Sequence, residues 1–272
     1  LLENKKISFN INNAKTIILN KKNIRLRYYF IVYILKIMYL KFKNSNATFL
    51  SFLPFPNILN LIIPIGKIII SERSVPSFYY NNYPNIQNRV INFFMKKLYK
   101  KSKCIIAVSE DCKNDLIIHY NCSEKIIKVV PNFIDFTKIK QLSNEAIENH
   151  LQIIFNKFVI VSLSRLVDYK GIKESIEIIS ELKKYNIKII YCIIGDGNER
   201  GNLIEYSKKL NLKIVFSPSN EDELKDVDII LLGEQKNPFK YLSKSKIFLH
   251  NSFIEGFPNV ILEALVCETF VV

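Results

Sequence analysis

Two glutamates near the end of the chain, Glu255 and Glu263, have seven residues between them, including a glycine, a proline and an apolar run. Glycine allows a tight turn, and proline is favoured in the first turn of a helix, so this spacing predicts a turn that leads directly into a helix. The turn would expose the backbone N–H groups of Phe257, Asn259 and Val260 to a ligand. Glu255 would lie at the mouth of this loop.

Glu263 would lie in the second turn of the predicted helix. There its carboxylate could accept two hydrogen bonds from a ribose diol. The alternative is a surface residue that compensates the positive end of the helix dipole. The spacing alone leaves both interpretations open.

A second candidate group follows the apolar run 157–164, where Arg165 precedes Lys170 by five positions and Gly171 comes next. Two cations in a strand-to-helix loop can hold a diphosphate, because arginine binds two oxygens at once and lysine supplies a point charge. The N-terminus of the following helix would add backbone donors. Two solvated surface charges are the alternative.

Three further patterns are weaker. The stretch 195–201 (GDGNERG) is one residue too long for the dinucleotide fingerprint, and a strand-to-helix turn is the alternative. Asp226 and Asp228 form an Asp-x-Asp pair, but they precede a strand instead of following one. The three histidines are dispersed, and no nucleophile–base pair is visible. No metal site is expected.

Alternating strands and helices must position these residues. Apolar runs predict strands at 67–71, 104–109 and 125–131, with helices at 85–101 and 110–119. After a polar stretch, further strands are predicted at 157–165, 188–195, 213–217, 227–233, 246–252 and 269–272. The helices between them are predicted at 171–185, 199–210, 237–245 and 258–267.

This alternation predicts an α/β fold with parallel sheets covered by helices. We expect two Rossmann-like domains facing each other across a cleft, at 1–135 and 156–272, with a connection at 136–155. Ligands of such sheets bind at the carboxyl ends of the strands, where the candidate residues lie.

The composition is basic, with a net charge of +14 and a pI of about 9.4. Such a charge suits nucleic acid, an anionic membrane or phosphorylated substrates. The richness in Lys, Asn, Ile and Tyr indicates a bias of the whole sequence, and no nucleic-acid-binding signature is present, so no nucleic-acid partner is expected. Five scattered cysteines without a CxxC pair indicate neither disulfides nor zinc and favour a cytoplasmic protein.

The apolar run 28–40 is flanked by Lys and Arg and is shorter than the roughly 20 residues needed to span a bilayer. It predicts either a buried helix of the α/β domain or a helix at the membrane surface.

Arg165, Lys170, the turn 195–197 and the stretch 255–264 (EGFPNVILEA) together resemble the retaining glycosyltransferases with the GT-B fold. That family carries an arginine, a lysine and a Glu–seven residues–Glu motif in its C-terminal domain. The resemblance covers about residues 60–272. The stretches 237–242 (NPFKYL) and 255–259 are similar to members that transfer N-acetylhexosamine or related sugars onto polyprenyl-diphosphate glycolipids and surface polysaccharides.

The resemblance implies a transferase that uses a nucleotide-diphosphate sugar, UDP-hexose or UDP-N-acetylhexosamine, with retention and without a cofactor or obligatory metal. Arg165, Lys170 and Glu255 would be catalytic, and the donor would also be bound by Gly256, Phe257, Pro258, Asn259, Val260 and Glu263. The acceptor would be polyprenyl-linked or a polysaccharide. The enzyme would lie peripherally on the inner face of the cytoplasmic membrane.

The chain also departs from that family. An opening strand with a Gly-rich loop is missing, and Cys267 to Phe270 replace a small residue, Gly and Pro. We therefore expect a fragment, with the first domain lacking its first strand and the second truncated at its end. Glu72 and Arg73 occupy the stretch where many relatives place a histidine near the sugar.

Two other functions fit the same architecture. A sugar-nucleotide epimerase would need acid–base groups beside the sugar and no acceptor. A non-catalytic remnant would bind nucleotide or a partner transferase without turnover.

Overall fold

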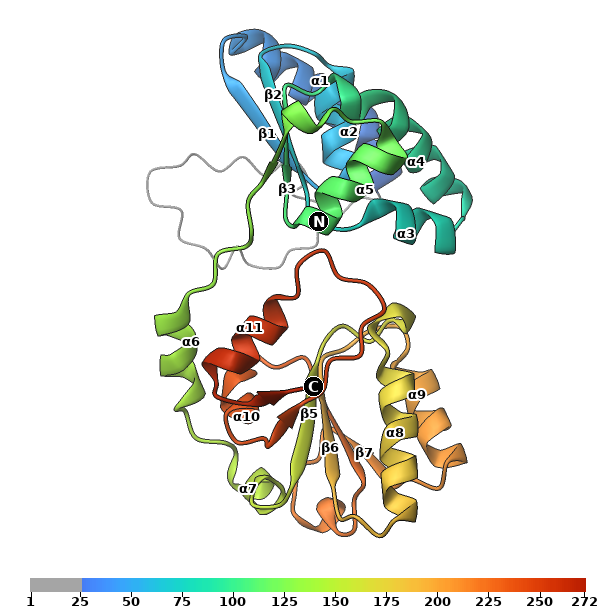
Figure 1. Cartoon of the computed structure of the whole chain (residues 1–272), viewed down its shortest axis with the longest axis vertical. Coiled ribbons are helices and arrows are strands. Elements are labelled where there is room, and N and C mark those ends of the chain that lie inside the picture. Colours follow the sequence, from blue (N-terminus) through green and yellow to red (C-terminus); the bar gives the residue numbers. More distant parts are fainter. Residues whose placement is uncertain (1–25) are drawn as a thin grey trace. The chain divides into compact units, whose positions relative to one another are not determined.

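The computed structural model describes residues 26–272, with side chains from residue 34 onward. The chain divides between Val130 and Pro131 into two compact units (Figure 1). Each unit contains a parallel sheet flanked by helices. The predicted α/β class is therefore confirmed.

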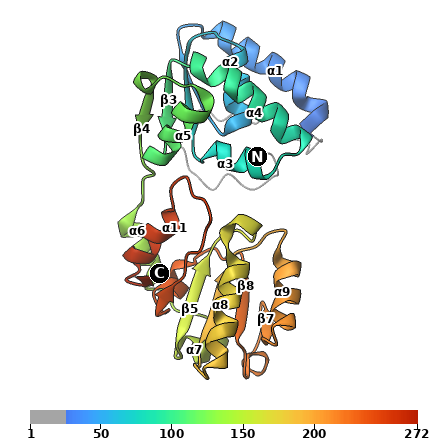
Figure 2. The ribbon, with the colours of Figure 1, turned by 45° about the vertical axis from the view of Figure 1, so that its right-hand side comes forward.

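Four parallel strands form the sheet of the first unit in the order β1-β2-β3-β4. They are β1 (Thr48–Phe52), β2 (Lys67–Glu72), β3 (Cys104–Ala107) and β4 (Ile127–Val129). The helices, most of them visible in Figure 2, are α1 (Leu26–Lys43), α2 (Pro54–Ile62), α3 (Pro76–Asn82), α4 (Ile86–Leu98) and α5 (Glu110–Tyr120). The three strands and the three helices predicted in this region, including the one over the run 28–40, are present, whereas β1, α2 and α3 were not predicted.

Helix α2 begins at a proline and ends at a buried lysine from another element. Proline at the first helical position has the backbone angle that a helix requires. At the other end, the ammonium of Lys41 donates to the carbonyl oxygens of Asn60 and Ile63, both over 2.6 Å. Burial lowers the pKa of Lys41 to about 8. One of the cations at the end of the predicted basic-flanked run therefore caps a helix.

Helix α1 contains the apolar run 28–40. Leu35, Tyr39 and Phe42 are exposed, so its described part is only partly covered. The positions 21–25 that precede it lie outside the described residues. None of the described helices is long and apolar enough to cross a membrane.

Six parallel strands form the sheet of the second unit in the order β10-β9-β5-β6-β8-β7. They are β5 (Val159–Leu163), β6 (Ile190–Ile194), β7 (Ile214–Phe216), β8 (Ile229–Gly233), β9 (Ile247–Phe248) and β10 (Phe270–Val271). The helices are α6 (Phe136–Ser143), α7 (Asn149–Phe155), α8 (Ile172–Lys184), α9 (Arg200–Lys209), α10 (Phe239–Leu242) and α11 (Asn259–Val266). All strands and helices predicted after residue 156 are present.

Alternate residues of the central strands enter two different cores. Val159 and Val161 pack with α7, α10 and α11, whereas Ile160 packs with α8 and α9 on the other face. Figure 1 shows these two helical layers on either side of the second sheet. Strands buried on both faces explain the continuous apolar runs that made them predictable.

The segment expected to be a bare connection contains α6 and α7. Leu151, Ile154 and Phe155 of α7 belong to the core of the second unit. The polar residues between these apolar positions concealed two short helices from the sequence pattern.

Candidate functional site

The loops that follow β5 and β9 meet at the carboxyl edge of the second sheet. Gly171 has a left-handed backbone with φ 65°. A Cβ atom there would lie 1.8 Å from the carbonyl oxygen of Asn251, so only glycine allows this approach. Beside it, the N–H of Phe253 donates to the carbonyl of Tyr169 over 3.0 Å. Backbone contacts therefore join the two loops.

The turn 195–197 after β6 packs against the same edge. A Cβ atom at Gly195, where φ is 134°, would lie 1.8 Å from the carbonyl oxygen of Ser164. Its backbone donors are engaged internally, because Gly195 N–H donates to Gly233 over 2.8 Å and Gly197 N–H to Asp196 over 2.7 Å. These bonds favour the strand-to-helix turn over a phosphate loop.

Lys170, Glu255 and His250 form a charged cluster on the joined loops. The Lys170 ammonium donates to Glu255 Oε1, and His250 Nε2 lies 3.3 Å from the same oxygen. The three side chains are 14%, 22% and 12% exposed. The structure thus brings together two residues that the sequence analysis assigned to different parts of a ligand.

The neighbours of Glu255 keep it ionised. Burial alone would raise the pKa of its carboxyl, but the nearby His250 ring, the hydrogen bond from Lys170 and the Lys170 charge lower that pKa to about 2. An ionised carboxylate can accept hydrogen bonds from sugar hydroxyls or stabilise a developing positive charge, but it cannot donate a proton.

His250 is a member of this cluster that the sequence analysis missed. Its ring stacks on Phe248, with centroids 6.0 Å apart and an angle of 14° between the planes. It lies just beyond β9, at the carboxyl end of a strand, and this position could have identified it as a candidate site residue. The dispersion of the histidines along the sequence concealed it.

Arg165 and Lys170 both lie beside Tyr169. Arg165 Nη2 donates to the Tyr169 hydroxyl over 2.8 Å, and the Lys170 ammonium lies 5.8 Å from the centre of its ring. Lys170 is largely buried and does not fit the alternative of a solvated surface charge. Arg165 is exposed and fits either interpretation.

The turn between Glu255 and α11 is partly engaged by internal bonds. Helix α11 begins at Asn259, one residue later than expected, with Pro258 in the preceding cap position. The Asn259 N–H donates to the carbonyl of Phe257 over 3.0 Å, and its side chain accepts from Asn132 over 2.7 Å. This N–H is therefore not free for a ligand, unlike the expectation from the sequence.

Glu263 lies in the second turn of α11, as predicted. Its side chain is partly buried, and burial raises the pKa of its carboxyl. Within residues 34–272 it has no hydrogen bond or ion pair. A carboxyl group whose pKa is raised by burial is partly removed from water, which argues against a fully solvated surface residue.

Asp228, the second residue of the Asp226–Asp228 pair, has a structural role as a hydrogen-bond acceptor. Asp228 Oδ2 accepts from Lys183 Nζ over 2.6 Å and from the N–H of Lys213 over 2.7 Å. Nowhere in the described part of the chain do three or more His, Cys, Asp or Glu side chains gather as a metal site would require.

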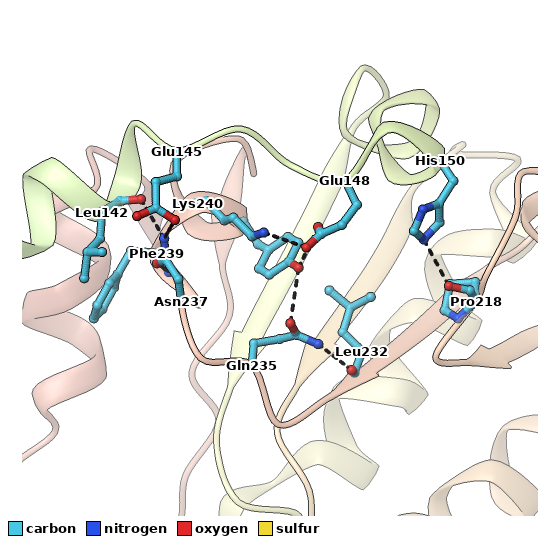
Figure 3. A network of polar contacts seen from close by, with 11 residues as sticks. Leu142, Glu145, Glu148, His150, Pro218, Leu232, Gln235, Asn237, Phe239 and Lys240 are labelled. Atoms are coloured by element: carbon cyan, nitrogen blue, oxygen red, sulfur yellow. Dashed lines mark hydrogen bonds and ion pairs between the residues drawn. The ribbon is translucent and has the colours of Figure 1, made fainter. Parts of the chain in front are cut away.

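A polar network braces the loop that follows β8 (Figure 3). Glu148, just before α7, accepts from Lys240 over 2.6 Å and from the Tyr241 hydroxyl over 2.8 Å. The Tyr241 hydroxyl also lies 3.3 Å from Gln235 Oε1, and Asn237 donates to the carbonyl of Leu142 over 2.9 Å. The segment predicted as a connection therefore holds a loop at the carboxyl edge, which no sequence pattern signalled.

Solved GT-B glycosyltransferases share this architecture. The Anabaena protein HepE, crystallised with UDP and glucose, superposes with a TM-score of 0.64 at 17% identity, over 93% of this chain and 65% of that one. A glycosyltransferase from Rickettsia africae superposes with a TM-score of 0.61 at 17% identity, over 93% and 64%. These likenesses establish the GT-B fold.

The family model Glycosyl transferases group 1 matches residues 143–272, and the model Glycosyltransferase Family 4 matches residues 51–138. An uncharacterized glycosyltransferase of Methanocaldococcus jannaschii is 34% identical over 215 residues, covering 76% of this chain and 48% of the relative. An N-acetylgalactosaminyltransferase of Campylobacter jejuni, which acts on a diphospho-undecaprenol-linked sugar, is 30% identical, covering 81% and 55%. The chain spans about half the length of these relatives.

The Gly171–Asn251 contact predicts a large effect of one added methyl group. Gly171→Ala should lower stability by several kcal/mol, because backbone must move and φ is unfavourable. Gly201→Ala is the matched control: a Cβ there meets nothing within 4 Å, so in helix α9 it should add about 0.5–1 kcal/mol. Urea unfolding of both variants tests this, and equal effects would contradict the assigned role of Gly171.

The lowered pKa of Glu255 predicts pH-dependent stability. Its ionised form should stabilise the fold above the unfolded pKa of about 4.3, and this contribution should disappear as the pH falls towards about 2. Wild type should therefore exceed Glu255→Gln in unfolding free energy by up to about 3 kcal/mol near pH 7, at 1.4 kcal/mol per pK unit. Denaturant titrations at several pH values measure the difference. A gap that stays constant down to pH 2 would refute the linkage.

Proposed function

We propose that this chain contains the donor site of a glycosyltransferase that moves a sugar from a nucleotide-diphosphate sugar to a lipid-linked or polysaccharide acceptor, with retention. UDP-hexose or UDP-N-acetylhexosamine is the proposed donor. The observation that carries the proposal is the partly buried carboxylate of Glu263, which has no side-chain partner among residues 34–272 and lies on the helix that follows the loop holding Glu255. The family-model match and the UDP bound by HepE support the assignment.

In this proposal the diphosphate lies against Arg165 and Lys170. Negative charge grows on the diphosphate as the bond to the sugar breaks, and fixed cations stabilise that charge. Lys170 is already bonded to Glu255, so the diphosphate shares this ammonium with the carboxylate. The pair is thereby held in position before the donor arrives.

Glu255 remains ionised in this proposal and faces the sugar, whose ring carbon becomes positively charged during transfer. Its low pKa excludes a role as general acid. The acceptor hydroxyl attacks the face that the diphosphate leaves and passes its proton to the departing phosphate. Glu263 accepts hydrogen bonds from the ribose. No metal or cofactor is required for these roles.

Substitution of the two glutamates should affect binding and turnover differently. Glu263→Gln should weaken UDP binding about tenfold, since each charge-assisted bond contributes about 1.5–3 kcal/mol. Glu255→Gln should leave the Kd for UDP nearly unchanged but lower turnover of the true UDP-sugar at least about tenfold. Calorimetric titration with UDP, followed by assays over a panel of UDP-sugars and acceptors, measures both.

Glu268→Gln provides the matched control, because Glu268 follows α11 and is exposed and paired with Lys140. It should change neither quantity. Loss of turnover in Glu263→Gln with loss of affinity only in Glu255→Gln would reverse the two roles. An epimer formed without an acceptor would replace the transferase proposal by an epimerase.

We further propose that the first unit binds an anionic membrane surface, where a lipid-linked acceptor would reside. Residues 1–130 contain 21 Lys and Arg against 6 Asp and Glu, whereas residues 131–272 contain 18 against 19. The basic excess therefore belongs to one unit and is not the whole-sequence bias that the composition indicated. Relatives that act on a diphospho-undecaprenol-linked sugar and in capsular polysaccharide biosynthesis support this acceptor class.

Helix α4 has the surface that such binding needs. Ile86, Val90 and Phe93 are 83%, 49% and 52% exposed and follow one another at helical spacing. Lys96 and Lys97 lie in its last turn. An apolar stripe with flanking cations is typical of a helix that lies in the membrane interface.

Removing two apolar side chains of α4 should weaken this binding. Ile86→Ser with Phe93→Ser should lower partitioning onto phosphatidylglycerol vesicles at least about tenfold, because both side chains would leave the interface. Ile118→Ser is the matched control, since Ile118 is 68% exposed on α5, whose first turn is acidic. Vesicle co-sedimentation measures the partitioning. Equal loss in both variants, or binding insensitive to salt, would contradict the proposal.

A further inference from the structure

A short loop between β2 and α3 presents one arginine at the carboxyl edge of the first sheet. Of the loop residues Arg73, Ser74 and Val75, only Arg73 is exposed. The preceding residue, Glu72, ends β2 and is 1% exposed. Ligands of parallel α/β sheets bind at this edge, so the loop lies where a ligand would be met.

The buried carboxylate of Glu72 holds the loop at its beginning. Glu72 Oε1 accepts from the N–H of Arg73 over 3.0 Å and from the Ser74 hydroxyl over 2.9 Å. Its other oxygen accepts from the Tyr99 hydroxyl over 3.0 Å. Tyr99 accepts in turn from Asn57 over 3.2 Å. One carboxylate therefore fixes two consecutive residues of the loop to the core.

A second buried carboxylate holds the other end. Asp115 of α5 is 6% exposed. It accepts from the hydroxyl of Ser77 and, over 3.2 Å, from the Ser77 N–H. The segment from Arg73 to Ser77 is thus fastened at both ends by carboxylates that come from different elements.

Burying carboxylates is costly, and two of them here fix a loop of a few residues. Burial raises the pKa of Glu72 despite the bonds that Ser74, Tyr99 and Arg73 donate. A turn whose only task is to connect β2 to α3 does not need such anchors. The anchors fix the backbone from which the Arg73 side chain extends, so a ligand that binds this side chain does not also have to order the loop.

The charge around Arg73 indicates the kind of ligand. Residues 73–109 contain no Asp or Glu but several Lys and Arg, and the two carboxylates at the ends of the loop, Glu72 and Asp115, are buried and bonded to the chain. The guanidinium presents a planar fork of donors that matches the oxygens of a phosphate. The surroundings therefore favour an anion with several oxygens over a neutral sugar.

We propose that Arg73 binds a phosphate group of the acceptor and that Glu72 is the residue that positions it. The phosphate site follows from the loop itself, whereas its assignment to a diphosphate-linked acceptor rests on the proposed function. The site differs from the donor site, whose residues all lie in the second unit.

Farnesyl diphosphate serves as the probe, titrated calorimetrically into the whole chain with saturating UDP present so that the donor site is occupied. Arg73→Gln should weaken farnesyl diphosphate binding at least about tenfold. Arg73→Lys should weaken it less, because lysine keeps the charge but lacks the planar fork of donors. Binding of UDP alone should be unchanged in both. Arg89→Gln on α4 is the matched control for loss of one surface charge and should stay within about twofold of wild type.

The positioning role of Glu72 is tested against Tyr99→Phe. Both Glu72→Ala and Tyr99→Phe should lower the unfolding temperature, because both break the buried network. Only Glu72→Ala should weaken farnesyl diphosphate binding, since Tyr99 bonds the oxygen that does not hold the loop. Equal weakening in the two variants would reduce Glu72 to a structural residue.

The outcomes separate this inference from the proposed function. UDP binding together with farnesyl diphosphate binding that ignores Arg73, or no farnesyl diphosphate binding at all, would overturn the phosphate site. Binding of farnesol as tight as that of farnesyl diphosphate would also overturn it, because the prenyl chain would then be the group recognised. Arg73-dependent binding without any UDP binding would leave the phosphate site standing and remove the transferase assignment.

Discussion

The candidate site depends on one steric constraint, the approach of Gly171 to the carbonyl of Asn251. Because Gly171 has no Cβ, the loops after β5 and β9 can lie in backbone contact. This contact places Lys170 on one loop beside Glu255 and His250 on the other. The low pKa of Glu255 follows from that neighbourhood. A side chain at position 171 would separate the loops and remove the electrostatic arrangement that the proposed chemistry uses.

Much of the second unit could be predicted because its strands are buried on both faces and read as continuous apolar runs. The turn and helix around Glu255 and Glu263 were likewise visible as a Gly–Pro pattern. The pairing of Lys170 with Glu255 was not, because it joins residues 85 positions apart through a contact that only glycine permits. Strand β1 was not predicted because it is a half-exposed edge strand with few β-branched residues. Helices α6 and α7 were not predicted because both are short and α6 is mostly polar.

The division of charge between the units could have been read from the sequence once a boundary was known. A net charge of +14 read over the whole chain indicates a compositional bias, but all of it falls in residues 1–130, because residues 131–272 contain 18 Lys and Arg against 19 Asp and Glu. The second unit balances its charges overall and concentrates cations locally, at Arg165 and Lys170. The anion binding proposed for the two units would therefore have a different physical basis in each: a broad positive field in the first and two placed side chains in the second.

Buried carboxylates connect these observations, because each unit treats them differently. Glu72 and Asp115 are fully engaged by donors of the chain, so their burial fixes backbone and leaves nothing for a ligand. Glu255 is engaged by Lys170, a cation that an anionic ligand would share, and lies beside His250. Glu263 has no side-chain partner among residues 34–272, and its partly buried carboxylate keeps lone pairs that the hydroxyl groups of a ligand could occupy. The degree of internal satisfaction thus orders these carboxylates, from Glu72 and Asp115, which hold backbone, to Glu263, which the proposed function assigns to the ribose.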